Sequence, residues 1–99
     1  MLDKLKSDNF AFYLHQNFRV HLDGVEPINL ELVRVTEAGT TSGQDARNPF
    51  SLHFLGPVSE QYLIQHIHRL EHGQMGNLEI FLVPLGFEDG RMRYEAIFT

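Results

Sequence analysis

The hydrophobic pattern of this chain is dominated by alternation between apolar and polar residues, which is typical of β-strands with one buried face. In the second alternating run the phase changes near Leu32–Val33, where a β-bulge would keep the apolar side chains on one face. Glu88-Asp89-Gly90 predicts a hairpin turn that pairs the last strand with the one before it, and Gly56-Pro57 is expected to end the third strand. The alternation predicts strands over residues 18–22, 28–36, 50–55, 78–84 and 92–98.

Three segments depart from this alternation. Ser7 or Asp8 can cap a short helix over about residues 8–15, where apolar side chains recur at helical spacing. Residues 37–49 are small, polar and rich in turn formers, so we expect a long mobile loop. From the residues alone, 59–73 fits a helix and a strand about equally well. About six strands and one short N-terminal helix predict an all-β fold, namely a small, mainly antiparallel barrel or sandwich.

Length and charge narrow the class of protein. A chain of 99 residues can form one buried core, so residues 1–99 are expected to be a single domain. The absence of cysteine excludes disulfides and thiolate metal sites. The net charge of -5, with scattered Lys and Arg, argues against a nucleic-acid partner. No stretch resembles a signal peptide or approaches about 20 apolar residues, so we expect a soluble protein that is cytoplasmic as synthesised and has no membrane partner.

Several pieces of sequence, taken in order, point to a family. They are the helix followed by Phe18, FSLHFLGP at residues 50–57, LIQHIHRLEHGQMGNLEIFLVPL at 63–85 and YEAIFT at 94–99. In this order they resemble a small bacterial family that is catalogued as a domain of unknown function and numbered 6916. The resemblance predicts a turn or short helix at 58–63 and a strand at 66–72. It implies no activity, cofactor or catalytic residue, and it associates the chain with phage-tail-collar-like or fibre-like surface proteins.

His66 and His68 give the sharpest chemical hypothesis. On a strand they place two imidazoles on one face, which suits a metal ion, with Glu71 nearby and His53 across a strand pair. The spacing does not match the His-x-His motif of cupins, in which the acid lies further away and glycines bracket the set. The resemblance also places residues like Gly and Tyr at these two positions. We therefore favour a chance pair, one packed in place of an aromatic residue and one at the rim, and predict no cofactor.

The remaining polar residues favour structural roles. His72 precedes Gly73 and Gly76 and is expected to lock that turn by a hydrogen bond to a backbone carbonyl. His15 and His21 have no partner in the sequence. The hydroxyl residues at 40–42 lie in the predicted loop without a nucleophile elbow, and the turn carboxylates at 88–89 are solvated. We therefore predict no catalytic residue.

Aromatic content is the last signal, because eight Phe and three Tyr exceed what one small barrel can bury. Phe81 and Val83 form a second apolar face on their strand, which either the N-terminal helix carrying Phe12 and Tyr13 or another chain would cover. These four residues are the predicted interaction site.

The leading hypothesis is thus a non-enzymatic structural or interaction module that binds a protein partner or itself. Its most concrete form is an accessory of a phage-tail-like or surface-fibre assembly, which would place the protein in an extracellular or phage-like particle. The alternative is a small-ligand or metal-binding barrel that uses His53, His66 and His68, with Glu71 as a further ligand. A third hypothesis, an inhibitor of another protein, rests only on the acidic charge and small size.

Overall fold

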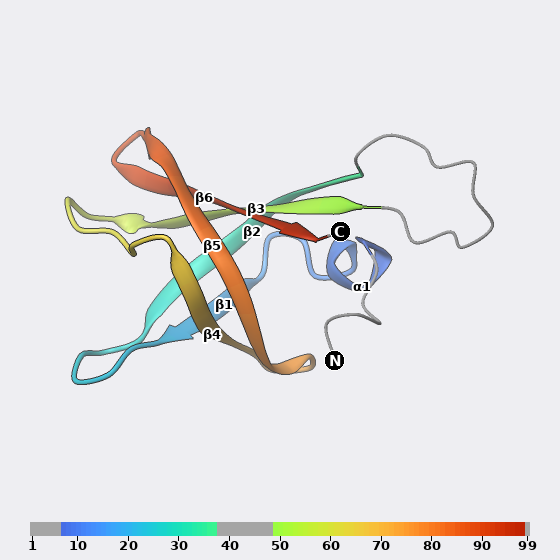
Figure 1. Ribbon diagram of the computed structural model, residues 1–99, viewed down its shortest axis with the longest axis horizontal. Helices are drawn as coiled ribbons and strands as arrows, with labels where there is room; N and C mark the ends of the chain where they lie inside the picture. The colour runs from blue at the N-terminus through green and yellow to red at the C-terminus, as the bar shows by residue number, and fades with distance from the viewer. Residues whose placement is uncertain (1–6, 38–48, 99) are drawn as a thin grey trace.

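Six strands close into a barrel in the part of the chain that this computed structural model describes, residues 7–37 and 49–98. Neighbouring strands are antiparallel, and their order around the barrel is β1-β2-β3-β6-β5-β4 (Figure 1). This confirms the all-β barrel, and the sandwich is not formed. The elements are α1 (Ser7–Ala11), β1 (Asn17–His21), β2 (Ile28–Glu37), β3 (Phe50–Val58), β4 (His66–His72), β5 (Gly76–Glu88) and β6 (Arg91–Phe98).

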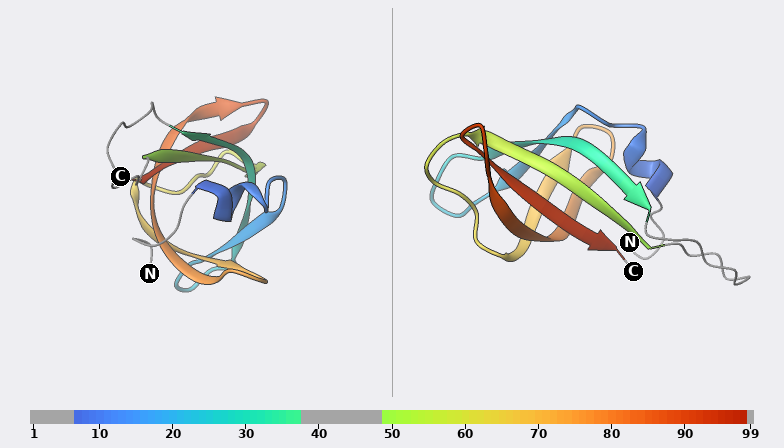
Figure 2. Two further views of the ribbon diagram at one scale, coloured as in Figure 1. Left: turned by 90° about the vertical axis from the view of Figure 1, so that its right-hand side faces the viewer. Right: turned by 90° about the horizontal axis from the view of Figure 1, so that it is seen from above.

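The core lies inside the barrel because the inward positions of the strands, every second residue, are mostly apolar. In β3, for example, Phe50, Leu52 and Phe54 are buried. The helix α1 lies over one end of the barrel (Figure 2). There the Phe10 ring packs with its centroid 5.9 Å from that of Phe50 and 5.5 Å from that of Phe98. The helix therefore closes the core instead of lying on the outer wall.

The segment between α1 and β1 is bound to the bulge of β2. The register of β2 against β3 shifts between Leu32 and Arg34, which confirms the predicted bulge. The N–H of His15 donates to the Leu32 carbonyl at 2.6 Å, and the Leu32 N–H donates to the Gln16 carbonyl at 3.0 Å. These bonds end the helix early: α1 stops at Ala11, and residues 12–15 form tight turns, with His15 at a φ of 69°. The prediction of a helix over 8–15 is therefore wrong in its second half.

The third strand does not end at Gly56-Pro57. It continues to Val58, and its register against β6 shifts between Leu55 and Val58. The Gly56 carbonyl accepts a hydrogen bond from Arg91 Nε at 2.6 Å, so the backbone stays bound where the ladder is irregular. The prediction of a stop here was wrong because a bulge, and not a turn, accommodates these residues. The fifth strand is also longer than predicted, and the turn at 88–90 is confirmed, with Asp89 and Gly90 both at positive φ.

The connection between β3 and β4 contains no helix, so the helical alternative at 58–63 was wrong. The Ser59 N–H donates to the Gly90 carbonyl at 3.1 Å, and a bend follows at Glu60. The strand predicted at 66–72 is confirmed as β4. Of the loop predicted at 37–49, Glu37 belongs to β2, and residues 38–48 lie outside the described residues.

One buried hydrogen bond ties this connection to the core. The Tyr94 hydroxyl accepts from the Leu63 N–H at 2.8 Å, and burial raises the pKa of the Tyr94 phenol. The substitution Tyr94→Phe would leave this amide without its partner, so we expect a loss of about 1–3 kcal/mol in unfolding free energy. Urea denaturation measures the loss. Tyr62→Phe, at a half-exposed tyrosine next to Leu63, is the matched control and should change stability by about 0.5 kcal/mol or less. Equal losses in the two variants would contradict the prediction.

Candidate interaction face

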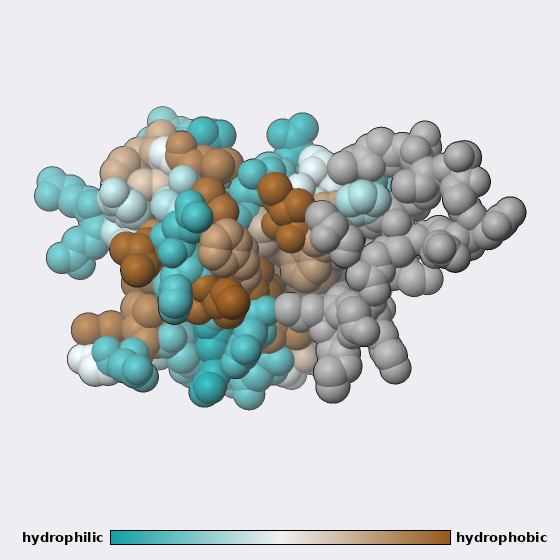
Figure 3. Space-filling view, viewed as in Figure 1, coloured by the Kyte–Doolittle hydropathy of each residue, from teal (hydrophilic) through white to brown (hydrophobic). Residues whose placement is uncertain are grey.

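Four apolar side chains form an exposed patch on the outer wall of the barrel, which we call the apolar face: Ile67 on β4, Phe81 and Val83 on β5, and Ile97 on β6. They point outward because their strand neighbours, such as Ile80 and Leu82, fill the core. Ile67, Phe81 and Ile97 are 56%, 48% and 62% exposed, and Val83 is partly buried. Ile67 lies directly opposite Phe81 across the β4–β5 ladder. Figure 3 views this side of the molecule and has apolar residues gathered where β5 crosses the front.

Charged side chains of both signs border the apolar face. Arg69 on β4 lies opposite Glu79 on β5, and Val83 lies opposite Glu95 on β6. Glu95 is 3.9 Å from His53 Nε2. Among the described residues, Arg69 and Glu79 take part in no ion pair or side-chain hydrogen bond. Both exposed charges are therefore available to an external partner.

The predicted interaction residues fall in two places. Phe81 and Val83 lie on the apolar face, but α1 packs against β2 and β3 at the end of the barrel and leaves Phe81 half-exposed. The interpretation that the helix covers Phe81 is therefore wrong, because Phe10 anchors the helix elsewhere. Phe12 and Tyr13 follow α1, with ring centroids 5.2 Å apart, and Tyr13 packs 4.4 Å from the His72 ring. Phe12 is exposed, yet it belongs to the barrel end and not to the apolar face.

The alternative metal set is not assembled. His66 and His68 do share a face, with ring centroids 5.7 Å apart, and His68 Nε2 donates to the Ile64 carbonyl at 2.9 Å. Glu71 points to the opposite face, where its Oε1 lies 2.6 Å from His21 Nε2. His53 is on β3, which two strands separate from β4 in either direction around the barrel. Across residues 7–37 and 49–98, no group of three or more His, Asp or Glu side chains is placed to hold a metal ion.

A groove of about 590 Å³ lies beside the apolar face. It runs between the end of β1 and the first half of β4. Its lining includes His21, Asp23, His66, Arg69 and Glu79. Sequence patterns offered no reason to group these residues, because the grouping depends on β4 lying between β1 and β5. Ile67, Arg69, Glu79 and Ile97 were missed for the same reason. Alternation could have placed each one on an outer face, but it could not place them beside Phe81.

His72 locks the turn between β4 and β5, as the sequence predicted, although by a different bond. Its Nδ1 accepts from the backbone N–H groups of Gln74 at 3.1 Å and Met75 at 3.3 Å, and makes no bond to a carbonyl there. Its Nε2 then carries the proton and donates to Gln16 Oε1 at 2.7 Å. The ring also stacks on Phe18 with a centroid distance of 4.7 Å. Burial lowers the pKa of His72, which favours this neutral form.

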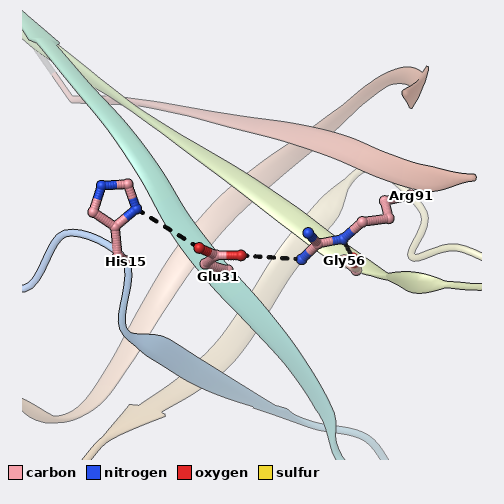
Figure 4. Close-up of polar contacts among 4 residues, drawn as sticks. All are labelled: His15, Glu31, Gly56 and Arg91. Atoms are coloured by element: carbon pink, nitrogen blue, oxygen red, sulfur yellow. Dashed lines mark hydrogen bonds and ion pairs between the residues drawn. The ribbon is translucent and has the colours of Figure 1, made fainter. Parts of the chain in front are cut away.

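A chain of polar contacts holds the β5–β6 hairpin against β2 (Figure 4). Arg91 donates from Nε to the Gly56 carbonyl and from Nη2 to Glu31 Oε1 at 3.3 Å. The other carboxylate oxygen of Glu31 is 3.7 Å from His15 Nδ1. Each charged group here has a protein partner, so this cluster fixes the hairpin and offers no free group to a ligand. The turn carboxylate of Glu88 lies 3.9 Å from Arg93.

Comparison with known proteins agrees with the family resemblance of the sequence. A family model described as a domain of unknown function, DUF6916, matches residues 5–98, which is nearly the whole chain. The chain belongs to this family. No curated protein and no solved structure gives a significant match. Within the described part of this DUF6916 domain, no helix has the length and apolar character needed to cross a membrane.

Proposed function

We propose that this DUF6916 domain is a non-enzymatic interaction module that docks a protein partner through the apolar face. The observation that carries the proposal is the pairing of Ile67 with Phe81, two large apolar side chains that lie opposite each other and are both about half-exposed. Contiguous exposed apolar surface costs free energy in water, and on soluble proteins it commonly marks a binding surface. A charged border around an apolar centre is the usual layout of a protein interface.

The setting we propose is an accessory role in a phage-tail-like or surface-fibre assembly. A closed barrel supports this use, because it has few free strand edges and so directs contact to its outer faces. The metal-binding alternative lacks an assembled ligand set, since Glu71 points away from the His66–His68 pair and His53 lies on a strand that is not adjacent to β4.

The chain offers an internally matched test of the proposal. Phe81 and Phe87 are both on β5 and are 48% and 49% exposed, but Phe87 lies outside the apolar face, against Tyr62. We expect Phe81→Asp to lose binding of partners, including free copies of this chain, by about tenfold or more, because it buries an unpaired charge in the interface centre. Phe87→Asp should bind as the wild type does. Quantitative pull-down from the native host, combined with light scattering of the purified chain, measures both variants. Equal binding by the wild type and Phe81→Asp would contradict the proposal.

A further inference from the structure

We infer that the partner is a second copy of this chain, docked across the seam between β4 and β5 by a two-fold axis that runs along the seam. This inference rests on the proposed function and names its partner. Its basis is the order of outward side chains on the two strands. Across the ladder, Ile67 lies opposite Phe81, and two residues further along Arg69 lies opposite Glu79.

A two-fold axis in the contact plane, parallel to these strands and midway between them, exchanges β4 and β5. Each outward residue of β4 then faces, in the second copy, the β5 residue that it is paired with in its own chain. Ile67 therefore meets Phe81 of the second copy, and Arg69 meets Glu79 of the second copy. Symmetry repeats both contacts, so the docked pair contains two apolar contacts and two ion pairs.

The two rows of facing residues, Ile67 with Phe81 and Arg69 with Glu79, are each complementary, so the seam of one copy can pack against the same seam of a second copy. The first row is apolar in both strands, and the second joins a guanidinium to a carboxylate. The next row brings the Asn77 amide to the Glu71 carboxylate, one oxygen of which already contacts His21. Neither Arg69 nor Glu79 has an ion-pair partner among the described residues, so docking would break no existing bond of these side chains. A partner surface that carries charges of one sign only could form an ion pair with Arg69 or with Glu79, but not with both.

The convex wall of a barrel limits the contact to a few strands of each copy. Such an interface falls at the small end of specific complexes, so we expect a dimer with a dissociation constant of about 1–100 μM. Ile97 on β6 extends the apolar row at its edge and would shield the central contacts from water. The dimer is thus expected to form at high protein concentration and to dissociate on dilution.

Charge reversal tests this geometry. In Arg69→Glu alone, the new carboxylate would face Glu79 of the second copy, and in Glu79→Arg alone, Arg69 would face a second guanidinium. We expect each variant alone to dimerise about tenfold or more weakly than the wild type. An equimolar mixture of the two variants should restore dimerisation, because every contact between unlike chains again joins opposite charges. Sedimentation velocity of each variant and of the mixture, at protein concentrations of about 1 μM to 0.5 mM, measures the extent of dimerisation. At about 1 M salt the repulsion between like charges in the single variants should weaken.

Two controls separate docking from folding. Either single reversal also places like charges opposite each other within one barrel, so its melting temperature is measured at a dilution where the wild type is monomeric. The double variant Arg69→Glu/Glu79→Arg restores opposite charges both within and between copies, and it should dimerise as the wild type does. A wild-type chain that stays monomeric at about 0.5 mM, or a mixture no tighter than its components, would overturn the inference. If the monomeric chain still binds a host protein in a Phe81-dependent way, the proposed function stands while the second copy is ruled out.

Discussion

Replacing Phe10 with alanine is expected to lower the unfolding free energy by about 3–5 kcal/mol, the range for a buried phenylalanine that leaves a cavity. Phe10 is fully buried and packs on Phe50 and Phe98 at the end of the barrel. The helix α1 has only five residues, too few to be stable by itself, so its attachment depends on this side chain. A domain of this size has a total stability of about 5–15 kcal/mol, so the variant should lose a large part of its stability.

Phe12→Ala is the matched control for Phe10→Ala. Phe12 lies two residues further along and is 79% exposed, with only the Tyr13 ring as an aromatic neighbour among the described residues. Removal of the Phe12 ring should lower the unfolding free energy by about 1 kcal/mol or less, which is the contribution of one exposed aromatic pair. Urea denaturation of both variants measures the difference. Similar losses at the two positions would mean that the helix does not close the core through Phe10.

The second large effect is expected at His72. His72→Leu keeps a buried apolar side chain but removes the acceptor for the Gln74 and Met75 amides and the donor to Gln16. We expect a loss of about 1–3 kcal/mol in unfolding free energy near pH 8, from the polar groups left without partners. His66→Leu, on the same strand at an exposed histidine, should change stability by about 0.5 kcal/mol or less.

The His72 contribution should also depend on pH, in a direction set by its lowered pKa. A protonated His72 could not accept at Nδ1, so the folded state resists protonation while the unfolded chain protonates near the ordinary pKa of 6.5. The unfolded state then binds more protons, and the wild type loses stability as pH falls below about 6.5, by at most about 1.4 kcal/mol per pH unit for one group. Urea denaturation from pH 8 to pH 5 should therefore find His72→Leu and the wild type converging. A constant difference across that range would mean that folding does not lower the pKa of His72.

The local pattern of apolar and polar residues predicted the strands well because consecutive residues of a strand point to opposite faces. The bulge near Leu32–Val33 was visible as a change of phase, and the turn at 88–90 as a run of turn-forming residues. The errors have a different cause. Residues 12–15 have helical spacing, but the Leu32 carbonyl at the β2 bulge accepts the His15 amide, and the helix ends before it. Likewise, Gly56-Pro57 is typical of a strand end, but Arg91, which lies far along the chain, donates a hydrogen bond to the Gly56 carbonyl and the strand continues.

The candidate site shows the same division. The residue pattern placed Phe81 on a second apolar face, and it placed His66 and His68 on one face. It could not decide whether Phe81 was covered, because that depends on where α1 docks. It also grouped His53 and Glu71 with the histidine pair, although Glu71 points to the other face and His53 lies across the barrel.

The sequence by itself determined which side of each strand is apolar, because neighbouring side chains on a strand point in opposite directions whatever the strand pairs with. Apart from the β5–β6 hairpin, only the tertiary structure decided which strands are neighbours and in what register. Pairing depends on contacts between residues far apart in the chain, and the register can be set only when the whole barrel closes. Ile67 meets Phe81, and Arg69 meets Glu79, because β4 turns back at His72 and pairs with β5. That pairing creates the centre of the apolar face and the charged row beside it.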